Sequence, residues 1–134
     1  MPGQLSSGAV NHVSLTVSDV SQSQDFYTNV MGFQVLMEIP PAVLLTNGGA
    51  VLGIHPPPDA DQVIAGDRFN ENRVGLDHLA FTVGSRDELE EWSHHFDQHG
   101  IPHGDITDLG RHFQLHALFF RDPDNIQLEL TAPY

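Results

Sequence analysis

The chain has 134 residues, of which 40% are hydrophobic and 17% charged, and no apolar run approaches the length of a membrane span. This composition predicts one globular domain with no membrane partner. Eighteen acidic residues against five basic ones, all arginine, give a formal net charge of −13, which argues against nucleic-acid binding.

The missing residue types exclude further chemistry. Without cysteine the chain forms no disulfides, and without lysine it cannot form a Schiff base with a substrate. The N-terminal MPGQLSSG has neither a basic region nor a hydrophobic stretch, so we expect a cytoplasmic protein rather than one exported by a secretory signal.

The first half of the chain predicts the order β-α-β-β-β. VNHVSLTV, starting at residue 10, alternates apolar and polar residues as a half-buried strand does. Ser18 and Asp19 can cap a helix that ends at Gly32. Three strand candidates follow, FQVLMEI, AVLLTN and AVLGIH, the last two joined by a turn at 47–49.

The second half predicts the same order again. Residues 56–73 are rich in proline and then polar, as a linker is. GLDHLAFTV then predicts a strand, Ser85 caps a helix that extends to about His99, and Gly100 ends it. A short strand near IPHGDI, the strand FQLHALFF, the turn DPDN and the strand IQLELTAP complete the series.

The two halves also match in sequence. HVSLTV at 12–17 aligns with HLAFTV at 78–83, and VLGIHPP at 51–57 aligns with QLELTAP at 127–133. The alignment pairs His12 with His78, Gly53 with Glu129 and His55 with Thr131. We therefore expect a single domain over residues 1–134, made of duplicated modules 10–58 and 75–133 joined by the linker 56–73.

Strand parity places three polar side chains away from the core. His12, His78 and Glu129 each alternate with apolar neighbours, so all three point to the opposite face of their strands. Two imidazoles and one carboxylate on rigid strands are the ligand set of a facial triad that binds a divalent metal. The alternative from residue types alone is a solvated polar face.

The paired modules, the opening NHVSLTVSDVSQSQDFYTNVMGF, the second GLDHLAFTV and the closing FFRDPDNIQLEL resemble the vicinal oxygen chelate superfamily, which includes glyoxalase I, fosfomycin-resistance enzymes, bleomycin-resistance proteins and extradiol dioxygenases. The resemblance implies an α+β fold of two tandem βαβββ modules whose mixed sheet forms a cup. It also implies a divalent metal ion (Fe, Mn, Ni or Zn) bound by His12, His78 and Glu129, a small-molecule substrate and a homodimer.

The sequence differs from three subfamilies at residues that those subfamilies need for their function, which makes each of these functions less expected here. Glyoxalase I places a fourth carboxylate ligand where Gly53 stands and an arginine where Thr16 stands, so that activity would need His55 as a substitute ligand. The chain has no lysine and no serine after Ser93, so we expect the phosphonate pocket of fosfomycin-resistance enzymes to be absent. Bleomycin-resistance proteins lack the metal ligands that this chain has.

Extradiol dioxygenases match the triad best, and they use an additional histidine to move protons, as suits a side chain with a pKa near neutrality. We expect His55 and His116 to be candidates for that role and Glu129 to act both as ligand and as proton carrier. We further expect Phe69, Phe113 and Phe120 to line the cup.

The sequence therefore predicts a metal-dependent enzyme that chelates vicinal oxygens of a small organic substrate, as a dioxygenase or as a lyase or isomerase. The alternative is a non-catalytic drug-binding or small-molecule-binding protein, which would bind no metal tightly and would tolerate His78→Ala. A third possibility is that the polar face only packs against another subunit.

Overall fold

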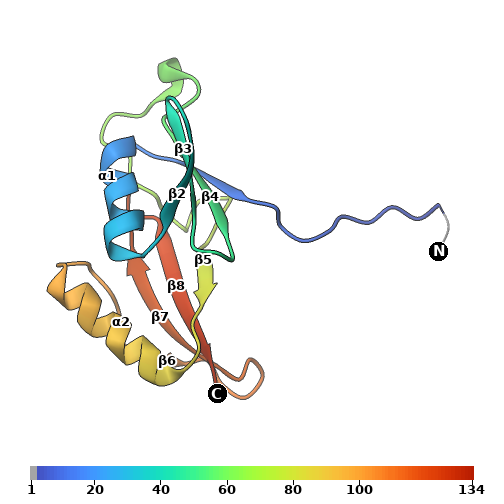
Figure 1. Ribbon diagram of the computed structural model, residues 1–134, viewed down its shortest axis with the longest axis vertical. Coiled ribbons are helices and arrows are strands. Elements are labelled where there is room, and N and C mark those ends of the chain that lie inside the picture. Colours follow the sequence, from blue (N-terminus) through green and yellow to red (C-terminus); the bar gives the residue numbers. More distant parts are fainter. Residues whose placement is uncertain (1–2) are drawn as a thin grey trace.

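The computed structural model describes residues 3–134, which form two four-stranded mixed sheets with the strand orders β1-β4-β3-β2 and β5-β8-β7-β6 (Figure 1). The first sheet contains β1 (Val13–Thr16), β2 (Gln34–Ile39), β3 (Ala42–Thr46) and β4 (Val51–His55). The second contains β5 (Leu79–Thr82), β6 (Thr107–Asp108), β7 (Leu115–Arg121) and β8 (Gln127–Pro133). The predicted α+β fold of two βαβββ units is confirmed.

The helices follow the first strand of each sheet. α1 (Val20–Asp25) continues directly into the π-helical turn η1 (Phe26–Val30), α2 spans Arg86–Gln98, and a short 3₁₀ turn, η2 (Ala60–Gln62), lies between the two sheets in the chain. The sequence predicts α1 and η1 as one regular helix. The structure differs because the amide of Met31 donates to the carbonyl of Phe26, five residues earlier.

Side-chain caps start both long helical segments at the predicted residues. The carboxylate of Asp19 accepts from the amide of Gln22 at 3.1 Å. Ser85 Oγ accepts from the amide of Glu88 at 3.3 Å, and Glu88 Oε2 accepts from the amide of Gly84 at 2.8 Å. The first of these bonds satisfies an amide that the first turn of α2 cannot pair internally, and the second ties the residue before the cap to that turn.

The same register is repeated in both sheets. β1 pairs with β4 in parallel and aligns Ser14 with Gly53, whereas β5 pairs with β8 in parallel and aligns Ala80 with Glu129. The sequence repeat pairs these same positions with each other. The duplication is therefore also a structural one.

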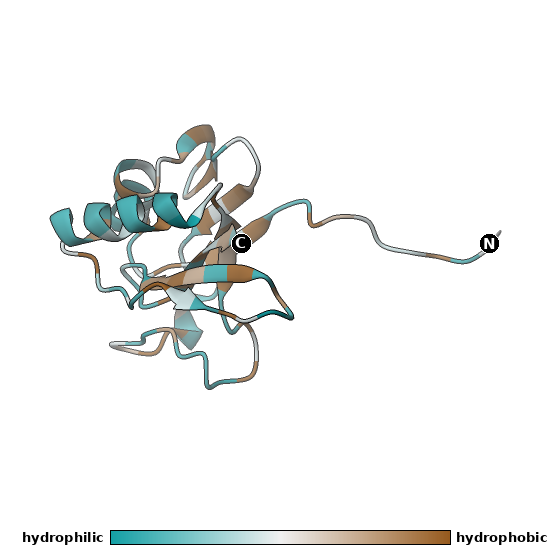
Figure 2. Ribbon diagram, turned by 90° about the horizontal axis from the view of Figure 1, so that it is seen from below, coloured by the Kyte–Doolittle hydropathy of each residue, from teal (hydrophilic) through white to brown (hydrophobic). Residues whose placement is uncertain are grey.

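One apolar core lies between the helices and the sheets. α1 and α2 pack on the same side of the two sheets (Figure 1), and α2 is largely hydrophilic on its outer surface while the strands are mostly hydrophobic (Figure 2). Phe33 and Phe81 meet across the two units with ring centroids 5.6 Å apart. The helices thus leave the other side of each sheet, which we call the open face, to carry polar residues.

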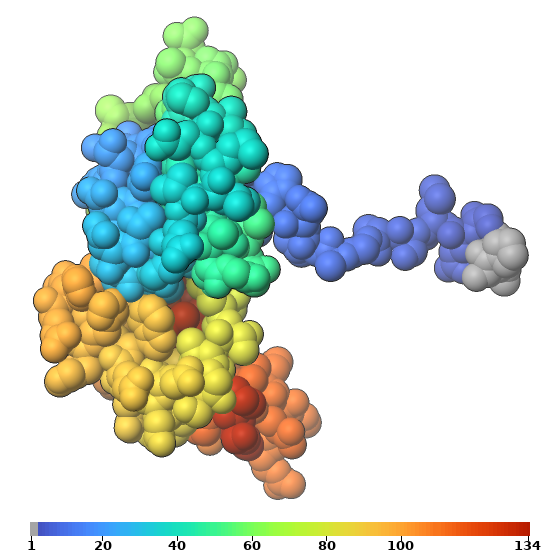
Figure 3. All heavy atoms as spheres, viewed as in Figure 1, coloured from blue at the N-terminus to red at the C-terminus, as the bar shows by residue number. Residues whose placement is uncertain are grey.

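The open face of β1 and the N-terminal segment are exposed. Ser14 and Thr16, which point to the open face of β1, are exposed. Residues 3–12 project away from the body (Figures 1 and 3), and the side chains of Leu5 and Val10 are 96% and 80% exposed. Within residues 3–134, the structure contains no helix with the length and apolar character that a membrane crossing needs.

Candidate metal centre

The parallel pairing of β5 with β8 brings His78 and Glu129 together. Glu129 is aligned with Ala80, and His78 lies two residues before Ala80, so both side chains lie on the open face. The methyl side chain of Ala80 leaves room above the strand. The Nε2 atom of His78 lies 2.8 Å from Oε2 of Glu129.

The carboxylate of this pair is withdrawn from water. Glu129 is 4% exposed, and burial raises the pKa of its carboxyl group, an effect that the nearby charge of His78 opposes. The ring of Phe119, which is aligned with Glu129 across β7 and β8, contacts the ring of His78 edge to face at a centroid distance of 5.7 Å. A buried carboxylate needs a partner that donates a hydrogen bond or carries positive charge, and His78 lies in contact with it.

The other nitrogen of His78 is hydrogen-bonded to Asp77. His78 Nδ1 lies 2.7 Å from Oδ1 of Asp77. Because a carboxylate only accepts, Nδ1 carries a proton, and in the neutral ring Nε2 then has a lone pair. Nε2 lies 2.8 Å from Oε2 of Glu129, a distance at which a proton shared by the two atoms forms an ordinary hydrogen bond, and at which the same two atoms could serve as adjacent ligands of one metal ion.

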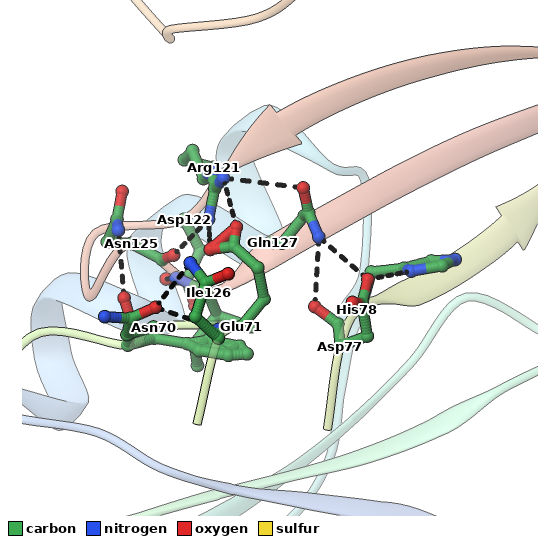
Figure 4. A network of polar contacts seen from close by, with 11 residues as sticks. Asn70, Glu71, Asp77, His78, Arg121, Asp122, Asn125, Ile126 and Gln127 are labelled. Atoms are coloured by element: carbon green, nitrogen blue, oxygen red, sulfur yellow. Dashed lines mark hydrogen bonds and ion pairs between the residues drawn. The ribbon is translucent and has the colours of Figure 1, made fainter. Parts of the chain in front are cut away.

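Asp77 is held in turn by residues from β7, β8 and the linker (Figure 4). Gln127 Nε2 donates to both the carbonyl oxygen and Oδ1 of Asp77 at 3.1 Å. Arg121 donates to Gln127 Oε1 at 3.4 Å and forms a two-pronged pair with Glu71 at 3.0 and 2.7 Å. The hydrogen bond from Arg121 lowers the pKa of Glu71 to about 2, and the same bond raises the pKa of Arg121.

His12 lies outside this group. It precedes β1 at the end of the exposed segment, and its Nδ1 lies 2.8 Å from Oδ1 of Asn11. Among residues 3–134 of one chain, no three His, Cys, Asp or Glu side chains are grouped closely enough to hold a metal ion. The chain therefore unites two of its three predicted ligands and leaves the third apart.

The position that matches Glu129 in the first sheet is Gly53, and a side chain there would have to displace the hydroxyl of Ser14. A Cβ atom there would lie 2.7 Å from Oγ of Ser14, its partner on β1. His55 is aligned with Thr16 and so shares the open face, and its Nδ1 lies 2.9 Å from the carbonyl oxygen of Pro56. The first sheet thus presents a hydroxyl where the second presents a carboxylate.

A sequence model of the Glyoxalase/Bleomycin resistance protein/Dioxygenase superfamily matches residues 9–130 of the chain. The chain belongs to this superfamily. The match covers the first sheet, the linker, the second sheet up to residue 130 of β8, and both His78 and Glu129.

Individual members of the superfamily are similar over nearly the whole chain. Metallothiol transferase FosB from Staphylococcus saprophyticus is 28% identical over 91% of this chain and 75% of its own length. The crystal structure of a glyoxylase/bleomycin resistance protein/dioxygenase domain from Frankia sp. EAN1pec has a TM-score of 0.75 and 32% identity, covering 96% of this chain and 94% of that one.

A more distant member, a mutant of the fosfomycin resistance protein FosX from Listeria monocytogenes, shares the fold with a TM-score of 0.73 at 18% identity, over 96% of this chain and 93% of that one. That structure was solved in complex with Mn(II) and 1S,2S-dihydroxypropylphosphonic acid. Members of the superfamily therefore use divalent metals and small organic ligands.

The structure corrects the expectation for His116. β7 and β8 pair without interruption, with Phe119 opposite Glu129 and His116 opposite Ala132, so His116 lies on the face that packs against α2 rather than on the open face. The expectation for Phe120 is wrong for the same reason, because Phe120 is 2% exposed and stacks on Phe96 in the core.

The two other phenylalanines differ in their surroundings. Phe113 is 68% exposed on a turn before β7. Phe69 lines an open cavity of about 1080 Å³ between β1 and the linker, together with Thr16 and Arg68. This cavity adjoins the strand that follows His12.

Sequence reasoning missed the neighbours of His78. Asp77 and Arg121 have no periodic signal, and their roles depend on side-chain contacts between segments about 50 residues apart. The one available signal is that Asn11 and Asp77, both with side-chain oxygens, precede the two repeated histidines.

Proposed function

We propose that this protein is a metal-dependent enzyme that binds vicinal oxygens of a small organic substrate. In the proposed site, His78 and Glu129 of one chain and His12 of a second copy hold the metal. The observation that carries this proposal is the contact of 2.8 Å between Nε2 of His78 and Oε2 of buried Glu129, a separation close to that of two adjacent ligands of one metal ion. Imidazole and carboxylate are ligands suited to Fe, Mn, Ni and Zn.

A second copy is the natural source of the third ligand. Asn11 Oδ1 can accept from Nδ1 of His12, which leaves Nε2 of this exposed histidine free to bind a metal. The open face of β1, where Ser14 and Thr16 lie, is exposed. In addition, the edge strand β2 exposes four large apolar residues, as expected of a surface that a homodimer buries. These residues are Val35, Leu36, Met37 and Ile39.

When bound, the metal would act as a Lewis acid toward an enolate or catecholate oxygen. The protein contributes proton carriers beside it. Glu129 has a pKa raised by burial, so its carboxyl group is suited to exchanging protons. His55 donates from Nδ1 to the carbonyl of Pro56, which leaves Nε2 as a proton acceptor on the open face of the first sheet.

The choice of reaction follows from what the first sheet lacks. Gly53 supplies no carboxylate at the position of the fourth ligand of glyoxalase I, and the chain has no lysine to hold a phosphonate. The reaction classes that fit three ligands are ring-cleaving oxygenation and proton-shuttling isomerisation or elimination. In either class the substrate is expected to be a cytoplasmic metabolite or xenobiotic.

The first test is the metal content of untagged protein purified without chelators, measured by plasma mass spectrometry for the wild type and for Glu129→Gln. We expect about one Fe, Mn, Ni or Zn per chain in the wild type and none in the variant, because the variant loses a charged ligand. The exposed helical residue Glu90, replaced in Glu90→Gln, is the matched control and should retain the metal.

The identity of the metal then directs the activity assay. Iron or manganese points to oxygen uptake with catechols, whereas nickel or zinc points to isomerase and lyase substrates. If the wild type stays free of metal after reconstitution with each of the four ions, the enzyme proposal is wrong and a metal-free binding protein takes its place.

A further inference from the structure

The two repeated histidines share a contact that the sequence repeat alone does not reveal. Nδ1 of His12 lies 2.8 Å from Oδ1 of Asn11, and Nδ1 of His78 lies 2.7 Å from Oδ1 of Asp77. In both cases the acceptor belongs to the residue immediately before the histidine. Both dipeptides lie just ahead of a first strand, β1 or β5, where no ladder hydrogen bond yet fixes the chain.

This contact decides which ring nitrogen is available. An imidazole that donates from Nδ1 presents its lone pair at Nε2, and a hydrogen bond at the first atom also fixes the ring plane. We propose that Asp77 and Asn11 are positioning residues that fix Nε2 of His78 and of His12 as the metal-binding atom. This inference rests on the metal site proposed above.

The surroundings of Asp77 support a dedicated role. Asp77 is held at two of its oxygens by Gln127, and Gln127 is in turn held by Arg121, whose guanidinium is paired with Glu71 (Figure 4). The side chain of Asp77 is 69% exposed, so this series of contacts restrains a carboxylate that would otherwise rotate freely. This series of hydrogen bonds, which runs from Glu71 to His78, thus connects the linker to the proposed ligand.

The chain itself suggests the matched variants. Asn11 shows that an amide oxygen is an adequate acceptor, so Asp77→Asn should preserve the contact, whereas Asp77→Ala removes it. The dissociation constant for Mn(II) or Zn(II), measured by calorimetry on the purified full-length protein, should rise about tenfold or more in Asp77→Ala. In Asp77→Asn the dissociation constant should stay within about threefold of wild type, because the acceptor oxygen is kept. The small remaining loss of affinity reflects a neutral hydrogen bond, which is weaker than a charge-assisted one.

A second variant and a spectroscopic measurement separate orientation from charge. Asp97→Ala removes another carboxylate that contacts a histidine, His103 at 2.6 Å, and it lies on α2 away from the open face, so its metal affinity should equal that of wild type. In the zinc-loaded wild type and in Asp77→Asn, imidazole ¹⁵N spectra should show His78 protonated at Nδ1. Asn11→Ala should weaken metal binding about as much as Asp77→Ala does.

The outcomes distinguish this inference from the function on which it rests. If the wild type binds no metal, both are wrong. If the wild type binds metal and Asp77→Ala binds it equally tightly, only the positioning role is overturned. It is also overturned if Asp77→Asn loses as much affinity as Asp77→Ala, because the acceptor oxygen would then not be the decisive feature.

Discussion

At the scale of single residues, a buried hydroxyl and carboxylate join the two halves of the chain. Tyr27, from η1, is completely buried and donates to Oδ2 of Asp122 at 2.7 Å. Oδ1 of Asp122 accepts from the amides of Asp124 and Ile126, both at 2.9 Å. Burial raises the pKa of Asp122 and the hydrogen bond from Tyr27 opposes that rise, so the hydroxyl helps to keep a carboxylate charged inside the protein.

Tyr27→Phe should lower the free energy of unfolding by about 1–3 kcal/mol, because it leaves Oδ2 of Asp122 without a donor. The loss should be greater at pH 7 than at pH 4. With its folded-state pKa raised, ionised Asp122 costs stability as pH rises above its unfolded value, and removing the donor raises that pKa further. Urea unfolding at the two pH values measures this.

The matched control is Tyr134→Phe, since Tyr134 also donates to a carboxylate, that of Asp108, but at the surface. Its effect should stay within about 0.5 kcal/mol. A loss in Tyr27→Phe that is no larger than in this control would contradict the role given to the buried pair.

The face of the sheet to which a side chain points could be predicted where the alternation of apolar and polar residues along the strand was clear. His78 and Glu129 alternate with clear apolar neighbours, and the structure brings them together as that parity implies. His116 precedes the run ALFF, in which adjacent apolar residues hide the parity, so only the register with β8 assigns its face. Side-chain partners such as Asp77 depend on orientation, which no periodicity specifies.

At the scale of secondary-structure elements, α2 ends in a pH-sensitive contact. Asp97 lies in the last turn of α2 and contacts Nε2 of His103, while Nδ1 of His103 is bonded to the carbonyl of Gly104. The hydrogen bond to Asp97 raises the pKa of His103. This contact fastens the end of the helix to the segment that returns the chain to the second sheet.

Asp97→Asn should lower Tm by about 2–4 °C at pH 6 and by much less at pH 9. A histidine whose pKa is raised on folding stabilises the protein below its unfolded value of about 6.5, and the effect is lost as pH rises through the folded pKa. Thermal melts followed by circular dichroism measure the difference.

Asp87→Asn, at the opposite end of the same helix, changes the charge equally without a histidine partner. Its effect on Tm should therefore be the same at both pH values. A pH-independent effect of Asp97→Asn would show that the contact does not titrate.

The elements themselves were predicted better than their ends. Caps at Asp19 and Ser85 start the helices as predicted, because a side-chain acceptor is a local signal. The π-helical turn η1 and the two-residue strand β6 were not predicted in that form, because packing against the core decides them.

At the scale of the whole molecule, His12 lies apart from His78 and Glu129 within one chain. Metal binding can therefore test whether two chains of a dimer share the proposed site. If the site is shared, mixing His12→Ala with Glu129→Ala chains restores one complete site in each mixed dimer, because each chain supplies what the other lacks. We expect about one metal ion per mixed dimer, against about two per wild-type dimer and none for either variant alone.

The mixed dimer can be purified with two different tags after unfolding and refolding the chains together. Light scattering should give about twice the chain mass of 14.8 kDa for every species. A mixed dimer without metal would mean that each site closes within one chain, by a movement that brings His12 across its own open face.

The crowding between Ser14 and the backbone of Gly53 restricts how such a protein can evolve. Any side chain at residue 53 displaces the hydroxyl of Ser14, whereas in the second sheet the small Ala80 has already made way for Glu129. A descendant that acquired an acidic side chain at 53 would have to turn the hydroxyl at 14 away or replace Ser14 with a smaller residue. The two positions are therefore expected to change together, so that a lineage passes from one chemistry to the other by a paired replacement rather than by gradual drift.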